Sequence, residues 1–309
     1  MRRFALRAGL RLADLLVASL PAAAGYALAD LAGAVWHRCA PRRRVLVSAN
    51  LARVLAGTGR SPSEAGLRRL VLRAFVEYAR YYYELLRAPH YSLGRVASTI
   101  DVKGWPELRA TLHAGPTVLA SPHLGNFEPF GAFLAANGIS AVAPVEETNP
   151  PELFEFLRAR RAGGRGMTVV PLSKAGRPLL EALRRGGTVG LIADRDLGGD
   201  GVAVQLFGHP TTMPTGPATL TVRTGSTLIV GSCLRVGRER FLVDTQSLPW
   251  QTSGDRRRDA EVLTRDLAAR FELLISAAPE QWFAVFQPIW PDIGWDVASA
   301  GPTDAGPSG

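Results

Sequence analysis

Pro116-Thr-Val-Leu-Ala-Ser-Pro-His-Leu-Gly-Asn-Phe-Glu-Pro129 is the stretch of sequence that decides the fold. Residues 116–121 are mainly apolar and partly β-branched, which predicts a buried strand. Asn126 is a favourable N-cap, and it places residues 127–129 in the first turn of a helix, where an acidic residue and a proline are both tolerated. A buried strand that leads directly into a helix is the repeating unit of a parallel sheet covered by helices.

The same alternation continues along the chain. Further buried strands are predicted at 167–172, 188–193, 227–233, 240–244 and 282–286, and helices at 128–136, 151–163, 174–186, 214–224 and 258–277. The pattern predicts an α/β fold with a mostly parallel central sheet covered by helices.

The first third of the chain has helical patterns and no strand pattern. Residues 4–38 form a helical pattern that breaks near Pro21, and residues 43–56 form a second one. The capping pattern Ser61-Pro-Ser-Glu64 opens a third helix, which runs to about Leu86.

Charge separates this region from the rest of the chain. We divide the chain into a basic helical region at 1–95, an α/β core at 96–296 and a tail at 297–309, whose small and polar residues predict disorder. Residues 1–95 hold 16 arginines, no lysine and five acidic residues, whereas the remainder has 20 basic and 22 acidic residues. Clustered positive charge attracts an anionic membrane surface or nucleic acid. Of these two partners we expect the anionic membrane surface and no nucleic acid.

The membrane attachment is predicted to be peripheral. The uncharged stretch at 15–29 has 15 residues, whereas about 20 apolar residues are needed to cross a bilayer. The segment 21–25 also fits the end of a signal peptide. However, the acidic residue Asp14 interrupts the sequence before the apolar stretch, and helical patterning resumes after residue 25. We expect two short amphipathic helices that lie on the membrane or against the body of the protein, and we expect the protein at the cytoplasmic face of the cell membrane. Cys39 and Cys233 have no metal-type or disulfide-type spacing, which fits a reducing compartment.

His123 is the candidate general base. It follows the strand that ends near Ser121, and ligands gather at the carboxyl ends of strands in open α/β sheets. With His123 in the loop before the Asn126 cap, the Glu128 carboxylate can reach back to an imidazole nitrogen. It would hold one tautomer and leave the other nitrogen to take a proton from an alcohol. A surface or capping contact between the two side chains is the alternative interpretation.

A family resemblance gives this pair a context. The segment His123–Glu128 resembles the signature of glycerolipid and lipid A acyltransferases, a histidine followed five residues later by Asp or Glu. Further segments resemble the lipid A lauroyl/myristoyl acyltransferase family and are most similar to its phosphatidylinositol mannoside acyltransferase branch. These segments are Tyr26–Gly33, Ser48–Leu51, Ala193–Leu197, Phe207–Gly208, Met213–Pro217 and Arg223–Gly225. That branch commonly has aspartate where this chain has Glu128.

The resemblance implies a glycerolipid acyltransferase-like fold and a membrane-associated acyltransferase. The donor would be acyl-CoA, or an acyl carrier protein in some members, and the acceptor a sugar hydroxyl of a glycolipid, such as a mannose of phosphatidylinositol mannoside. His123 would deprotonate the hydroxyl, which attacks the thioester directly. No acyl-enzyme is needed, and the sequence has no Gly-x-Ser-x-Gly elbow. The resemblance implies no metal and no cofactor besides the donor substrate, and it leaves the oligomeric state open.

The resemblance also implies further site residues. Asp196 matches the family's acidic position and would join His123 and Glu128 as a catalytic residue. Glu147 aligns with a functional glutamate, and Arg160 aligns with an arginine that binds a phosphate of the acceptor or of CoA. A solvated helix face is the alternative interpretation of Arg160.

Asp194, Arg195 and Asn126 complete the predicted site as substrate-binding residues. Asp194 and Asp196 follow the same predicted strand, so either acid can support the general base or bind sugar hydroxyls. A loop ion pair around Arg195 is the alternative. The backbone amides of Gly125 and Asn126, at the start of the helix, would hold the thioester oxyanion.

Other functions fit parts of the sequence. Asp194-Arg195-Asp196 resembles an Asp-x-Asp metal and nucleotide-sugar motif, so a metal-dependent glycosyltransferase is one alternative and transfer to another phospholipid is a second. A non-catalytic membrane or nucleic-acid binding protein fits the basic N-terminal region but leaves the strand–His–helix arrangement unexplained. The sequence has no Walker A loop and no Rossmann glycine fingerprint, so neither nucleotide hydrolysis nor NAD is expected.

Overall fold

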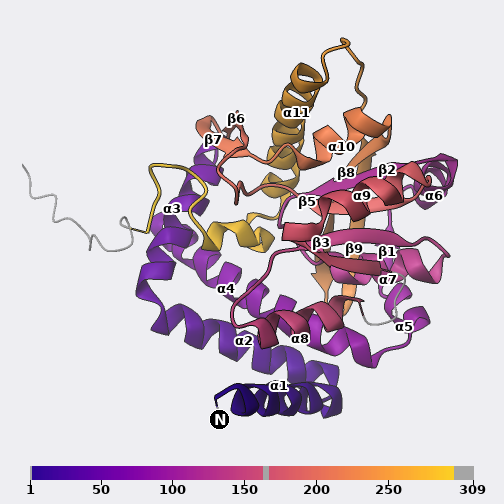
Figure 1. Ribbon diagram of the computed structural model, residues 1–309. Helices are drawn as coiled ribbons and strands as arrows, with labels where there is room; N and C mark the ends of the chain where they lie inside the picture. Colours follow the sequence, from indigo (N-terminus) through magenta and orange to yellow (C-terminus); the bar gives the residue numbers. More distant parts are fainter. Residues whose placement is uncertain (1, 163–166, 296–309) are drawn as a thin grey trace, which may run out of the picture.

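A computed structural model describes residues 2–162 and 167–295, and in it a seven-stranded sheet lies among helices (Figure 1). The strands run across the sheet in the order β1 (Ile100–Val102), β9 (Arg240–Ser247), β8 (Thr227–Gly237), β2 (Thr117–Ser121), β5 (Thr188–Ile192), β3 (Ala141–Val145) and β4 (Met167–Pro171). All neighbouring pairs are parallel except β8 and β9. The structure therefore confirms the α/β fold with a mostly parallel central sheet.

Helices cover both faces of the sheet. One face packs against α9 (Gly176–Arg184), α10 (Gly216–Thr224) and α11 (Arg256–Ala277), and the other against α6 (Trp105–Ala114) and α7 (Phe127–Ala136). Helix α8 (Pro151–Ala162) follows β3, and a hairpin of β6 (Val202–Leu206) and β7 (His209–Met213) leaves the sheet after β5. Short helical turns are α5 (Leu93–Ala97), η1 (Ala88–His90), η2 (Leu172–Lys174), η3 (Pro279–Gln281) and η4 (Phe283–Phe286).

Four helices precede the sheet: α1 (Arg2–Ser19), α2 (Ala22–Cys39), α3 (Pro41–Gly57) and α4 (Glu64–Arg87). The predicted break near Pro21 is confirmed, because proline lacks the amide hydrogen that the helix interior needs. Leu51 of α3 and Phe75 of α4 are fully buried in the same core as Val118 of the sheet. Helices α1 and α2 lie outermost, at the lower edge of Figure 1. No helix in the described ranges has the length and apolarity to cross a bilayer.

Some predicted elements differ from the structure. Residues 282–286 were expected to form a strand, but Phe283–Phe286 form the 3₁₀ turn η4. A short apolar run that is buried on every side has no periodicity that separates a strand from a helical turn. The cap of α4 is Ser63, which accepts a hydrogen bond from the amide of Gly66 at 3.1 Å, so the helix begins later than the pattern starting at Ser61 indicated. The predicted tail at 297–309 lies outside the described residues.

Candidate active site

The loop that carries His123 is fixed on both sides by backbone hydrogen bonds. The amide of Gly125 donates to the carbonyl of Gln281 at 2.9 Å, and the amide of Asn126 donates to the carbonyl of Cys233 at 2.8 Å. The carbonyl of His123 accepts from the amide of Phe283 at 2.7 Å. Gly125 has a φ of 73°, and a Cβ there would collide with the carbonyl of Cys233, so only glycine fits. The two amides predicted to hold an oxyanion are therefore already bonded.

His123 contacts Asp194 across two neighbouring strands. Strands β2 and β5 pair in parallel with Ser121 opposite Ile192, so the residues that follow them leave the sheet side by side. The imidazole Nδ1 of His123 lies 2.5 Å from Oδ1 of Asp194, and the backbone amide of His123 donates to Oδ2 at 2.8 Å. The indole of Trp282 donates to the same Oδ2 at 2.6 Å.

Burial differs sharply between the two partners. The Asp194 side chain is 1% exposed, whereas the His123 side chain is 35% exposed. Burial alone opposes ionisation of Asp194, but His123 and the Trp282 hydrogen bond hold the pKa of that carboxyl below its usual range. An ionised Asp194 fixes the proton of His123 on Nδ1. Within the described residues Nε2 has no hydrogen-bond partner, so it is available as a proton acceptor.

Glu128 does not contact the imidazole, contrary to the expectation from its spacing. Its Oε1 accepts from Nε of Arg161 at 2.8 Å and from the Tyr81 hydroxyl at 3.4 Å, and Arg161 also donates to that hydroxyl at 3.0 Å. Glu128 is the second residue of α7, and its side chain points toward Tyr81 of α4 and Arg161 of α8, away from the loop that precedes the helix. Burial raises the pKa of Tyr81 to about 12, so this hydroxyl stays protonated beside the Glu128 carboxylate.

The other acids predicted for the site have local partners. Asp196 accepts from the amides of Gly199 and Gly201, both at 2.9 Å, and thereby closes the loop that follows Asp194. Its neighbour Arg195 lies 3.6 Å from Glu146. Asp194 and Asp196 therefore face different partners, which disfavours the Asp-x-Asp interpretation, and of the two acids it is Asp194 that contacts His123.

Arg160 and Glu147 lie on other contacts as well. Arg160 donates to Asp14 of α1 at 2.7 Å, which ties α8 to the N-terminal helix. Glu147 accepts from the backbone amide of Ser173 at 3.3 Å and from its hydroxyl. The arginine that meets the motif carboxylate is the next residue along α8, Arg161.

Comparisons with known proteins identify the family of this chain. The family model described as bacterial lipid A biosynthesis acyltransferase matches residues 8–290. The chain belongs to this acyltransferase family. Proteins named phosphatidylinositol mannoside acyltransferase from two strains of Mycobacterium tuberculosis are 36% identical to it over 249 residues, which is 78% of this chain and 75% of each relative. The protein of that name from Mycolicibacterium smegmatis is 34% identical over 255 residues, covering 78% of this chain and 77% of its own.

A buried ionic cluster joins the loop that carries His123 to helices α2 and α4. The side-chain amide of Asn126, which is 1% exposed, donates to Glu84 of α4 at 2.8 Å. The same carboxylate accepts from the Tyr26 hydroxyl at 2.6 Å and from two nitrogens of Arg235. Arg235 also pairs with Glu77. The Asn126 side chain, predicted to bind substrate, is therefore bonded to Glu84 and closed to solvent in this structure.

The residues that sequence reasoning missed carry weak sequence signals. Trp282 was assigned to a strand, although a buried indole N–H needs an acceptor and Asp194 is the one it finds. Arg235 interrupts an otherwise apolar strand, and a buried arginine requires carboxylate partners. Both signals indicate that a partner exists, but neither identifies it, because Glu84 lies 151 residues away from Arg235.

Proposed function

We propose that this acyltransferase moves a fatty acyl group from acyl-CoA to a sugar hydroxyl of a glycolipid, a mannose of phosphatidylinositol mannoside. The observation that carries the proposal is the His123–Asp194 pair, in which a buried carboxylate holds Nδ1 and leaves Nε2 open. The names of the mycobacterial relatives support the choice of acceptor.

The proposed mechanism has a direct attack. Nε2 of His123 takes the proton of the acceptor hydroxyl while the hydroxyl oxygen forms a bond to the carbonyl carbon of the thioester. The tetrahedral intermediate then collapses, the carbon–sulfur bond breaks, and the thiolate takes the proton back from Nε2. Asp194 stabilises the imidazolium between these steps, and such a base contributes about 10² to 10⁴ in rate. Because Glu128 accepts a hydrogen bond from Arg161, we assign Glu128 the role of positioning the Arg161 side chain.

The proposed location is the cytoplasmic face of the cell membrane. Helices α1 and α2 carry large apolar residues, each of which is more than half exposed: Leu12, Leu15, Leu16, Leu28, Leu31 and Val35. These residues lie in the part of the chain with the excess of arginine. Exposed leucines together with positive charge fit an interfacial helix that inserts its apolar face among anionic lipid headgroups. Peripheral docking would bring the glycolipid acceptor within reach of an enzyme that takes a water-soluble donor.

The test is an acyl transfer assay with the full chain. Labelled palmitoyl-CoA, or a labelled acyl carrier protein, is incubated with phosphatidylinositol mannosides, glucosaminyl phospholipids and phosphatidylinositol without a sugar. We expect the label on the mannosylated lipid, and a loss of about 10² to 10⁴ in rate for His123→Ala with the circular dichroism spectrum unchanged. Full activity of His123→Ala would contradict the mechanism. Transfer to the lipid without mannose would contradict the choice of acceptor.

A further inference from the structure

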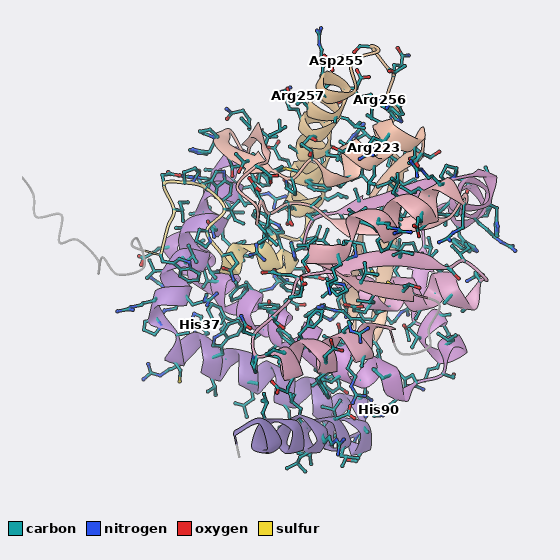
Figure 2. The ribbon with its side chains drawn as sticks, in the orientation of Figure 1. His37, His90, Arg223, Asp255, Arg256 and Arg257 are labelled. Carbon is teal, nitrogen blue, oxygen red and sulfur yellow. The ribbon has the colours of Figure 1, made fainter. Side chains whose placement is uncertain are left out.

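A hollow of about 720 Å³ lies between α10, α11 and the chain that leads into β6, apart from His123 and its partners. Its lining includes four arginines, of which three are labelled in Figure 2: Arg223 at the end of α10, and Arg256 and Arg257 at the start of α11. Arg265, two turns further along α11, is the fourth. The lining also includes small and apolar residues: Gly201, Val202, Ala203, Val222 and Ala260.

The cationic groups around the hollow are incompletely paired. Arg257 and Arg265 share one carboxylate, that of Glu261, at 3.2 and 3.8 Å. Neither Arg223 nor Arg256 has an ion pair or hydrogen bond from its side chain within the described ranges. Four arginines against two acidic residues, Asp200 and Glu261, leave an excess of positive charge in the lining of the hollow.

Further hydrogen-bond donors line the same hollow. Thr215 caps α10 without a side-chain hydrogen bond, and the hydroxyl of Thr219, one turn later, likewise has no partner among the described residues. At the start of α11 the amides of Arg257 and Arg258 are already taken by Asp255. Among the described residues, the side chains without an acceptor in the hollow are therefore those of Arg223, Arg256, Thr215 and Thr219, and the bonded helix amides are not available.

We propose that this hollow binds the phosphate groups of a water-soluble ligand. Planar guanidinium groups match phosphate oxygens in a bidentate fashion, and a doubly charged phosphate ester neutralises the local excess of charge. Figure 1 places the start of α11 at the opposite end of the molecule from α1 and α2. If α1 and α2 rest on the membrane, the hollow faces the aqueous phase, where a soluble phosphorylated molecule reaches it and a lipid headgroup does not.

The position of the hollow favours the nucleotide end of the acyl donor as the source of these phosphates, and this attribution rests on the proposed function. The loop that begins at Asp194 reaches the lining residue Gly201 after seven residues, a span of at most about 25 Å. Asp196 bonds the amides of Gly199 and Gly201 and so fixes the course of that loop. The same loop thus carries Asp194, the partner of His123, and one wall of the hollow, which is the arrangement that a donor with a long flexible arm requires.

The experiment compares the wild-type chain with the double variant Arg223→Gln, Arg256→Gln. Calorimetric titration with adenosine 3′,5′-bisphosphate measures the site directly, without catalysis. We expect the variant to raise the Kd about tenfold, because two charged contacts are lost, and to weaken the salt dependence of binding. The matched control is Arg109→Gln, Arg240→Gln, which removes the same charge from two exposed arginines outside the hollow. The control should bind like the wild type.

Parallel assays separate the sources of the phosphate. A rise in the KM for palmitoyl-CoA with kcat unchanged would identify the donor, whereas weaker bisphosphate binding with an unchanged KM would identify a separate soluble ligand at the same site. Equal affinity of wild type and double variant for the bisphosphate would overturn the proposal, as would an equal loss in the control. A defect confined to binding of phosphatidylserine vesicles would also overturn it, in favour of a lipid headgroup. Because the titration needs no turnover, failure of the proposed function leaves this test intact.

Discussion

Charged side chains are placed differently in the N-terminal helices and at the carboxyl ends of strands β2 and β5, where His123 lies. On α1–α4 the charged groups are mostly near solvent, as in the pair of Arg80 with Asp30, whose side chains are 28% and 40% exposed. At the sheet edge a single carboxylate, Asp194, is 1% exposed and is bonded by His123 and Trp282. The electrostatic attraction exerted by exposed charges is screened by salt beyond the Debye length. The attraction between a buried carboxylate and its partner is screened much less.

The largest effect is expected from the buried side of this comparison. Asp194→Asn would remove the charge that holds the His123 tautomer, and we expect kcat to fall by about 10³ to 10⁴, as in other histidine–aspartate pairs. Binding to anionic vesicles should not change, because the helices are untouched. The measurement is a steady-state transfer assay beside a vesicle sedimentation assay. Asp196→Asn distinguishes the two acids, and a greater loss in that variant than in Asp194→Asn would refute the assignment.

The second effect lies at the boundary of the two regions. Arg235 is 3% exposed on its side chain and pairs with Glu77 and Glu84 of α4. Arg235→Met would leave the buried Glu84 without its cation and Glu77 with Arg80 alone, and we expect the free energy of unfolding to fall by about 3 to 5 kcal/mol in urea titrations. Replacing both glutamates by glutamine in the same variant should recover part of the loss. Arg240→Met, at an exposed position of the neighbouring strand β9, serves as the control and should change stability little.

The third effect isolates the apolar face of the N-terminal helices. Leu15 of α1 is 65% exposed and Leu273 of α11 is 64% exposed, so they form a matched pair on the two regions. If α1 inserts among lipids, Leu15→Gln should weaken vesicle binding about tenfold, because the contact of one leucine with the apolar phase is lost. Leu273→Gln should have no effect on vesicle binding. Equal losses in the two variants would show that α1 is not the docking element.

The smallest effect is the response to salt. Between about 0.1 M and about 1 M NaCl the Debye length shortens from about 10 Å to about 3 Å. Attachment to anionic vesicles should weaken over that range, since it depends on exposed arginines. Turnover of a detergent-solubilised acceptor at saturating acyl donor should change much less, because Asp194 is buried against His123. Attachment that is insensitive to salt would indicate that apolar insertion alone holds the protein at the membrane.

The sequence predicted some elements well and missed others for physical reasons. The strand at 117–121, the helix that Asn126 caps and the break at Pro21 follow from local preferences, and each is present. Strand β3 (Ala141–Val145) was missed, because it contains Pro144 and has little apolar periodicity. The turn at 283–286 was mistaken for a strand, because its burial comes from neighbours that are distant in the sequence.

The sequence by itself determined that a histidine follows a buried strand and precedes a capped helix, because caps, turns and strand preferences depend on neighbouring residues. Only the tertiary structure decided which carboxylate meets that histidine. Glu128 is five residues from His123 and bonds Arg161, whereas Asp194 is 71 residues away and bonds the imidazole. The physical reason is the parallel pairing of β2 with β5, which brings the residues that follow these two strands together. Glu128 lies in the first turn of α7, and the helix directs its side chain away from His123.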